Sequence, residues 1–234
     1  MSARKTHRRL LLSFAAALLA VPLFALATSP DYPLAPGTRW TFHLHEELGP
    51  GTSFNEQDAP LAKGNALDLQ VVSEVTGSEV VGGKTYARIE SKRNGKLSLR
   101  EWYRLAPEGL VEGKSFDAEA GEEHLMSPPQ KLLSPTLQPG ETWTWRAPDA
   151  PVTIRTRVVG PESVTVPAGT YPATKLDVLT TIPLGDAVLQ VQQFRWYAPG
   201  VGYVKQQTET RVGTRLLNRI DLTLEKFQAA ATSR

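Results

Sequence analysis

The sequence predicts an all-β protein in which one strongly curved antiparallel sheet, either an open half-barrel or a sandwich, is built from two similar halves. Three observations lead to this prediction. Beyond residue 30, apolar and polar residues alternate with a period of two, which gives a strand one apolar and one wetted face. Turn-forming residues separate these runs at intervals of roughly 8–12 residues, and no convincing amphipathic helix interrupts them. We therefore expect about ten to twelve strands.

The alternation is clearest in four runs, two in each half of the chain. Their apolar members are Trp40, Phe42 and Leu44; Leu67, Leu69 and Val71; Val152, Ile154 and Val158; and Ile220, Leu222 and Leu224. The breaks between runs have turn chemistry. Asn94-Gly95 suits a two-residue hairpin because both residue types tolerate positive φ, and Gly82-Gly83 is placed where a second hairpin turn belongs.

A weak internal repeat underlies the two halves. The matched pairs, which follow the same order in each half, are residues 36–42 with 139–145, 83–87 with 168–172, and 102–111 with 196–201. We place the first half at 28–133 and the second at 134–234. The first half carries a polar, Gly- and Pro-containing loop insertion at 47–66, and an irregular linker at 113–138 joins the halves. Such loops carry binding function or serve as solvated spacers.

The composition is that of a folded domain. Of the 234 residues, 41% are hydrophobic and 21% are charged, which differs from disordered and coiled-coil chains. Cysteine is absent, and this excludes disulfides, cysteine-ligated zinc, a thiol nucleophile and a lipid-modified amino-terminal cysteine.

Residues 1–27 have the pattern of a secretory signal peptide. A basic start within residues 4–9 precedes an apolar run, and residues 25–27 form a small-x-small cleavage site, Ala-Leu-Ala. The alternative is a retained anchor, because the uncharged stretch 10–27 approaches the ~20 residues that span a bilayer. We expect cleavage before Thr28, a periplasmic or secreted protein, and membrane contact only through an uncleaved signal.

Charge and motifs argue against nucleic acid and nucleotide partners. Without the signal, 22 basic and 24 acidic side chains remain, whereas nucleic-acid affinity comes mostly from neutralising phosphates. The glycine-rich residues 77–85 lack the spacing of a phosphate-binding loop, and no helix follows that could hold a phosphate. We expect no cofactor.

Two histidines are the candidate metal ligands. His43 and His45 lie two residues apart on a strand, so their side chains emerge on one face roughly 6–7 Å apart, and Glu47 continues that face. The alternative is a solvated surface, because the face opposite Trp40 and Phe42 is the wet one. A metal-dependent hydrolase is accordingly the least favoured function class. No nucleophile motif accompanies these histidines or His124, so we expect no enzyme.

Aromatic side chains are the candidate ligand-binding residues. Most of them lie at strand starts or ends beside turns. The set comprises Trp40, Trp102, Trp143, Trp145, Trp196 and Tyr197. Core packing is the default role of aromatics in sheets. The functional alternative is an aromatic-lined concavity that holds an apolar ligand on the inner face of a curved sheet.

Two segments carry a resemblance to a known family. Residues 164–173 read VTVPAGTYPA and residues 196–205 read WYAPGVGYVK. With these motifs, residues 136–225 resemble a family of exported bacterial proteins of unknown function, which are similar to the lipoprotein-carrier fold. The resemblance implies an open half-barrel with an apolar concave face, and it supplies no catalytic residues.

These observations favour an exported, non-enzymatic binding module of the cell envelope. Its ligand would be an apolar or lipidic small molecule, or an envelope protein, held on a curved sheet with loop 47–66 as a cover. The main alternative is a structural or interaction protein that has no ligand pocket and uses sheet edges or the polar face.

Overall fold

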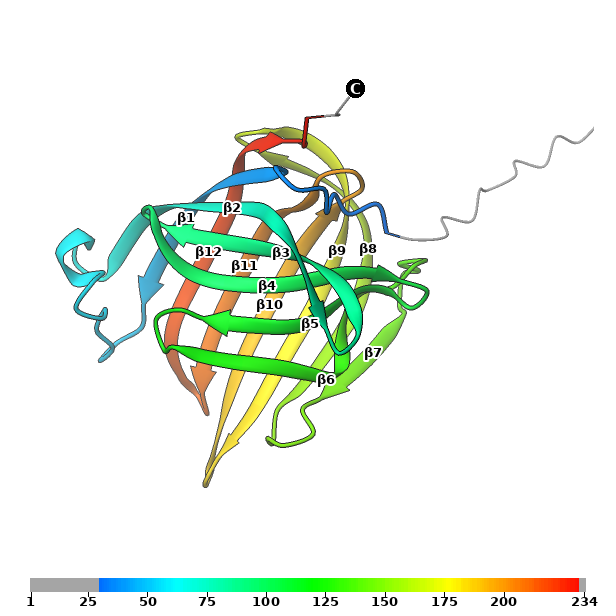
Figure 1. The fold of residues 1–234 in the computed structure, drawn as a ribbon. Coiled ribbons are helices and arrows are strands. Elements are labelled where there is room, and N and C mark those ends of the chain that lie inside the picture. The colour runs from blue at the N-terminus through cyan, green and yellow to red at the C-terminus, as the bar shows by residue number, and fades with distance from the viewer. Residues whose placement is uncertain (1–29, 232–234) are drawn as a thin grey trace, which may run out of the picture.

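The computed structural model describes residues 30–231, and these fold into one twelve-stranded antiparallel sheet (Figure 1). The strands are β1 (Arg39–Leu48), β2 (Ala66–Val81), β3 (Lys84–Arg93), β4 (Lys96–Ala106), β5 (Gly109–Asp117), β6 (Glu122–Leu133), β7 (Thr142–Arg146), β8 (Thr153–Val166), β9 (Gly169–Leu184), β10 (Ala187–Ala198), β11 (Gly202–Val212) and β12 (Arg215–Gln228). A 3-10 turn, η1 (Ala59–Leu61), is the one helical element within this range. The all-β, antiparallel prediction is confirmed.

The strand order places the two ends of the chain in the middle of the sheet. It runs β6-β5-β4-β3-β2-β1-β12-β11-β10-β9-β8-β7, so each half is a six-stranded meander and the halves join where β1 pairs with β12. The sheet curls until its edges, β6 and β7, approach one another (Figure 1). The result is a nearly closed, barrel-like sheet. No helix in residues 30–231 is both long enough and apolar enough to cross a membrane.

Two tryptophans hold the edges of the sheet together. Trp143 of β7 donates its indole N–H to the carbonyl oxygen of Lys131 in β6, and Trp145 donates to the carbonyl of Pro128, both at 2.8 Å. The Lys131 ammonium also lies 4.6 Å from the centre of the Trp143 ring. Side-chain donors therefore take the place of backbone ladder bonds between the edge strands. We call this junction of β6 and β7 the seam.

The segment expected to be an irregular linker, 113–138, contains strand instead. β5 continues to Asp117 and β6 occupies Glu122–Leu133, so only the turn between them and the chain after β6 are irregular. Pro128 and Pro129 are compatible with β6 because it is an edge strand, where the missing N–H groups leave no ladder bond unmade. The expected loop at 47–66 contains η1, between the end of β1 and the start of β2.

The hairpin turns follow the predicted chemistry. Gly82 and Gly83 connect β2 to β3 with φ values of 54° and 75°, and Asn94 and Gly95 connect β3 to β4 with φ values of 45° and 81°. Two consecutive positive φ values match the right-handed twist of the flanking strands.

Irregularities of the ladder fall at corresponding places in the two halves. The β2–β3 register shifts between Val75 and Gly77, and the β8–β9 register shifts between Val158 and Gly160. The two Trp-Tyr pairs, 102–103 in β4 and 196–197 in β10, also coincide with register shifts. Matched shifts of this kind are what a duplication predicts, although the common origin of the halves stays a prediction.

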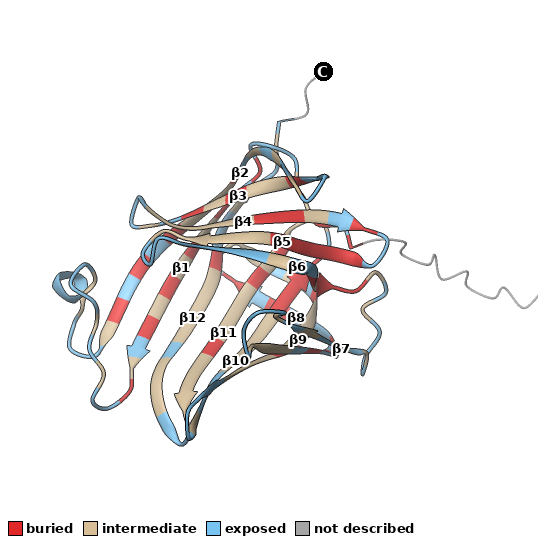
Figure 2. Ribbon diagram, turned by 60° about the horizontal axis from the view of Figure 1, so that its bottom comes forward, coloured by how far each residue is buried: buried red, intermediate tan, exposed pale blue. Residues whose placement is uncertain are grey.

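The main core lies inside the sheet. Buried residues alternate with more exposed ones most clearly along β1, β2 and β8, as the period-two pattern requires (Figure 2). Inward-facing aliphatic residues such as Leu110, Leu176 and Leu224 have no exposed surface. A small second cluster, built from Tyr86, Trp102, Ala106 and Val111, is separate from this core.

Candidate functional site

The curled sheet encloses a cavity of about 340 Å³. Its apolar lining comes mainly from five neighbouring strands, β12, β1, β2, β3 and β4. These side chains are Trp40, Phe42, Leu44, Val71, Ile89, Leu99 and Leu222. These side chains point to the inner face of the sheet. Because apolar residues recur at every second position, they form one apolar wall, which we call the apolar wall of the cavity.

The rest of the cavity is polar. Glu101 and Tyr103 come from β4, Gln193 and Arg195 from β10, and Tyr203 from β11. In the sheet, β4 and β10 are separated by five other strands, β3, β2, β1, β12 and β11. Only the curling of the sheet brings their side chains together. We call these five residues, with Glu112 of β5, the polar cluster.

Two carboxyl groups of the polar cluster are strongly affected by burial. Burial raises the pKa of Glu101, although the hydrogen bond from Tyr103 Oη to Glu101 Oε1 at 2.5 Å and the Arg195 charge oppose this shift. Burial raises the pKa of Glu112 further, to well above its ordinary value, and the neighbouring charge of Glu101 adds to that effect. Of the two carboxyl groups, Glu112 is therefore the one that holds a proton more firmly.

Arg195 has hydrogen-bonding capacity to spare. Its Nη2 donates to Gln193 Oε1 at 2.7 Å, but Nε is buried without a hydrogen-bond partner in residues 30–231. The guanidinium carbon lies 5.5 Å from the centre of the Tyr203 ring. The Tyr203 hydroxyl is near this guanidinium, yet within the described chain it has no hydrogen bond of ordinary length. Two buried donors of the polar cluster are thus free.

Tyr32 lines the cavity from outside the strands. This residue belongs to the segment before β1 and is buried. Its ring stacks on Tyr197 at 6.3 Å and meets Tyr103 and Tyr203 edge-on at 6.1 and 5.9 Å between ring centres. The segment is fixed by the hydrogen bond from Gly200 N to the carbonyl oxygen of Asp31, at 2.7 Å.

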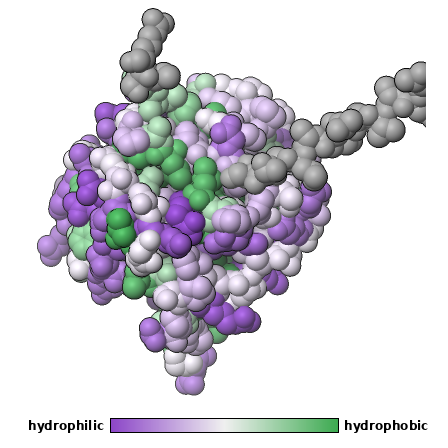
Figure 3. All heavy atoms as spheres, turned by 45° about the vertical axis from the view of Figure 1, so that its right-hand side comes forward, coloured by the Kyte–Doolittle hydropathy of each residue, from purple (hydrophilic) through white to green (hydrophobic). Residues whose placement is uncertain are grey.

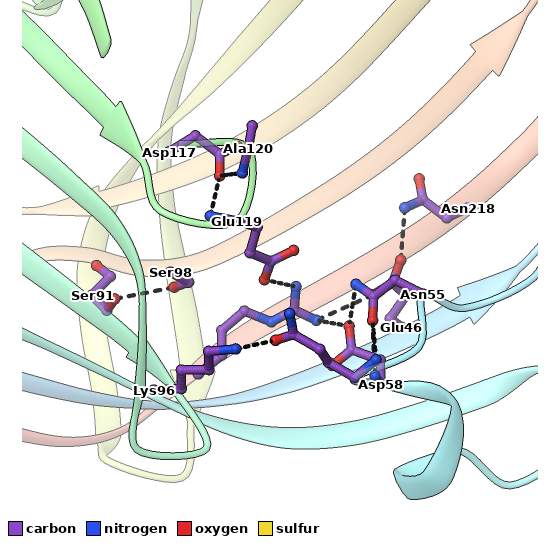
Figure 4. A network of polar contacts seen from close by, with 12 residues as sticks. Glu46, Asn55, Asp58, Ser91, Lys96, Ser98, Asp117, Glu119, Ala120 and Asn218 are labelled. Carbon is purple, nitrogen blue, oxygen red and sulfur yellow. Dashed lines mark hydrogen bonds and ion pairs between the residues drawn. The ribbon is translucent and has the colours of Figure 1, made fainter. Parts of the chain in front are cut away.

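The loop after β1 is fastened by a network of ion pairs and hydrogen bonds (Figure 4). Arg93, at the end of β3, lies 3.2 Å from Asp58 of the loop, 3.7 Å from Glu46 of β1 and 3.5 Å from Glu119 in the β5–β6 turn. Lys96 also donates to Gln57 Oε1 at 2.6 Å. Four separate segments of the chain therefore meet at one guanidinium, which itself lines the cavity.

Of the aromatic residues predicted to bind a ligand, Trp40 alone is among those that line this cavity. Trp143 and Trp145 form the seam. Trp102 belongs to the separate cluster and donates to Glu79 Oε2 at 2.9 Å. Trp196 packs beneath the ammonium groups of two lysines, and Tyr197 packs against Tyr32. Packing and hydrogen bonding therefore account for most of the set.

His43 and His45 share a carboxylate on the surface. Their ring nitrogens lie 3.1 and 2.9 Å from Asp68 Oδ1, and His45 Nε2 lies 3.5 Å from Glu47. The hydrogen bond to Asp68 raises the pKa of His45 and lowers that of Asp68. All of these side chains are more than a third exposed, and they do not line the cavity. In residues 30–231, no group of three or more side chains is arranged to hold a metal ion.

The residues that sequence reasoning missed are the charged members of the polar cluster. Glu101 lies two positions from Leu99, and Arg195 lies two positions from Gln193, and all four residues line the cavity. The signal that could have identified them is a charged residue at an inward-facing position of a strand, because a buried charge needs a partner or a ligand.

On the face seen in Figure 3, hydrophobic residues form a band at the upper centre that hydrophilic residues border, and other hydrophobic residues are scattered among hydrophilic ones.

These features define the class of protein: an antiparallel, barrel-like β protein that encloses a cavity of mixed polarity. Among known families, the DUF3108-like family matches residues 146–215, which is less than half of the chain. This match falls inside residues 136–225, the segment on which the sequence resemblance rests.

Two solved structures are similar at low identity. One is a candidate lipoprotein from Parabacteroides distasonis, with 13% identity, a TM-score of 0.43, and coverage of 85% of this chain and 98% of that one. The other is a candidate exported protein with a YmcC-like fold from Bacteroides fragilis, with 15% identity, a TM-score of 0.41, and coverage of 85% and 99%. No curated protein matches the sequence.

Proposed function

We propose that the chain is an exported, non-enzymatic binding module of the cell envelope that holds an apolar or lipidic ligand inside the curled sheet. The observation that carries the proposal is the cavity of about 340 Å³ with an apolar wall, in which Ser73 and Ser91 bond to each other. Its volume lies in the range of small-molecule sites, which combine apolar lining with a few polar groups.

Burial of apolar surface would supply the affinity. Removing apolar area from water is worth roughly 25 cal/mol per Å², and the side chains of the wall are already fixed by the sheet, so little ordering cost is added on binding. Tyr32 precedes β1 and the loop follows it, and both would limit the access of water to a bound ligand.

Export is the part of the proposal that rests on sequence. Residues 1–27, which carry the predicted signal, lie outside the described residues. The basic start, the apolar run and the Ala-Leu-Ala site support delivery to the periplasm or the medium.

A cavity-filling substitution tests the function. We expect the wild-type protein to bind the apolar fluorophore N-phenyl-1-naphthylamine, and Ile89→Trp, which places an indole in the apolar wall, to weaken that binding at least tenfold. The matched control is Val188→Trp, because Val188 is exposed on β10 and does not line the cavity.

Fluorescence titration measures both variants, and circular dichroism checks that each is folded. Equal binding by Ile89→Trp and wild type would show that the fluorophore binds elsewhere. Absence of binding by folded wild-type protein, together with no copurified lipid in native mass spectrometry, would favour the interaction protein without a ligand.

A further inference from the structure

The polar cluster has a balance of charge that restricts what it accepts. It contains one guanidinium, Arg195, and two carboxyl groups, Glu101 and Glu112. Glu101 accepts a hydrogen bond from Tyr103, whereas burial favours the protonated form of Glu112. With Glu101 ionised and Glu112 protonated, the cluster itself is neutral. Two further cations, Arg93 and Lys205, line the cavity, but Arg93 is paired with carboxylates and the Lys205 ammonium lies 4.9 Å from the centre of the Trp196 ring, which does not line the cavity. An added ion would therefore lack a counter-charge within the cluster.

The cluster also offers both kinds of hydrogen-bonding group to the cavity. Arg195 Nε and the Tyr203 hydroxyl are buried donors without partners in residues 30–231. Acceptors lie beside them, because the Glu101 carboxylate and the Gln193 amide oxygen also belong to the lining. A group that both accepts and donates would satisfy this set, and a hydroxyl does both.

We propose that the polar cluster is a subsite for an uncharged, hydroxylated head group of an amphiphile whose acyl chain lies along the apolar wall. Hydroxyl groups of the head group accept hydrogen bonds from Arg195 Nε and Tyr203 Oη. They donate hydrogen bonds to the carboxylate of Glu101 or the amide oxygen of Gln193. This inference rests on the proposed function, since it specifies the ligand of the same cavity.

Four amphiphiles with matched chains test the head group. Glycerol monododecanoate carries two hydroxyls, and methyl dodecanoate has the same ester and chain without them. Dodecanoate is an anion and dodecylammonium a cation. Displacement of N-phenyl-1-naphthylamine, below the concentration at which each probe forms micelles, gives the four dissociation constants. We expect glycerol monododecanoate to bind at least tenfold more tightly than each of the other three, because unmade hydrogen bonds at buried charged groups are costly.

Two variants tie that preference to the polar cluster. Tyr203→Phe removes one hydroxyl and keeps the ring, and Arg195→Gln removes the guanidinium. Each should reduce the preference for glycerol monododecanoate over methyl dodecanoate to threefold or less, while the affinity for methyl dodecanoate changes little. The control is Arg157→Gln, because Arg157 is exposed and pairs with Asp177 outside the cavity. If Arg195→Gln does not fold, Tyr203→Phe alone decides.

The outcomes separate this inference from the proposed function. Tightest binding of dodecanoate or of dodecylammonium would overturn the uncharged head group. Equal binding of all four, or a preference that survives in a folded Tyr203→Phe variant, would also overturn it while leaving the apolar cavity in place. Failure of every amphiphile and of the fluorophore to bind would contradict the proposed function itself.

Discussion

Glu112 is a carboxyl group on the inner side of β5, buried and close to Glu101. Since burial raises its pKa in the folded protein, folding is favoured by protonation. That contribution is fully present below the pKa of the unfolded chain and is lost as the pH rises through the higher pKa of the folded state. The other charges that act on it are those of Glu101 and Arg195.

We therefore expect Glu112→Gln to raise the Tm at pH 8 by about 2–4 °C, the shift that roughly 1 kcal/mol produces in a domain of this size. At pH 5.5 the difference should shrink, because a lower pH favours the protonated form of the wild-type carboxyl group. Thermal unfolding at the two pH values measures this. Glu108→Gln, on the exposed β4–β5 turn, is the control and should leave the Tm unchanged at both. A Tm difference that is the same at pH 5.5 and pH 8 would contradict the assignment.

Single residues were the hardest part to predict from the sequence. Trp40 was selected by residue type and lines the cavity, but Trp102 and Trp143 were selected by the same rule and serve packing and the seam. For Glu101 and Arg195 the sequence offers only a weak signal, a charge within a strand. Their significance depends on which phase of a strand points inward and on which strands lie across from one another, and neither is a local property.

The seam between β6 and β7 is held by side chains and not by a backbone ladder. Each indole N–H bond contributes on the order of 1 kcal/mol. We expect Trp143→Phe and Trp145→Phe each to lower the Tm by about 2–4 °C and to accelerate amide hydrogen exchange in β6 and β7.

Trp196→Phe is the matched control, because the Trp196 indole N–H is buried without a partner in the described chain, so the substitution removes no hydrogen bond. It should leave the exchange of β6 and β7 as in wild type. Unchanged exchange of β6 in both seam variants would show that the edges do not depend on these bonds.

At the scale of elements, the sequence was informative. The period-two runs became strands, and the Gly82-Gly83 and Asn94-Gly95 turns are hairpins. The error was β6. Its prolines disrupt both helix and central strand, and nothing local indicates that a proline-containing segment lies at an edge, where it is tolerated.

At the scale of the whole molecule, Arg93 fixes the loop after β1 to β1, β3 and the β5–β6 turn. Asp58, Glu46 and Glu119 converge on this guanidinium, so its loss leaves three carboxylates facing one another. We expect Arg93→Gln to increase amide hydrogen exchange of residues 49–65 by about three- to tenfold, since individual ion pairs of this kind contribute up to about 1 kcal/mol and several act together here.

Exchange monitored by mass spectrometry at low and high salt measures this effect. Wild-type protection of the loop should decrease with salt, and that of the variant should not. Arg88→Gln, which removes a pair with Glu90 away from the loop, is the control. Loop exchange that is identical in wild type and Arg93→Gln would show that the hydrogen bonds around Gly49 and Thr52 are sufficient.

The closure of the sheet could not be read from the sequence, which left a half-barrel and a sandwich open. Alternation determines which residues face inward, but not the accumulated twist and coil of twelve strands. The cavity and its polar cluster are consequences of that curvature, so the site could not be predicted without the fold.

The pairing of β1 with β12 has a consequence for how the polypeptide matures. A nascent chain emerges amino end first, and one flank of β1 finds its neighbour only when the last strand has been made. Until then the pairing that joins the two halves of the sheet is missing. The cavity inside the sheet can therefore form only after β12 has been made.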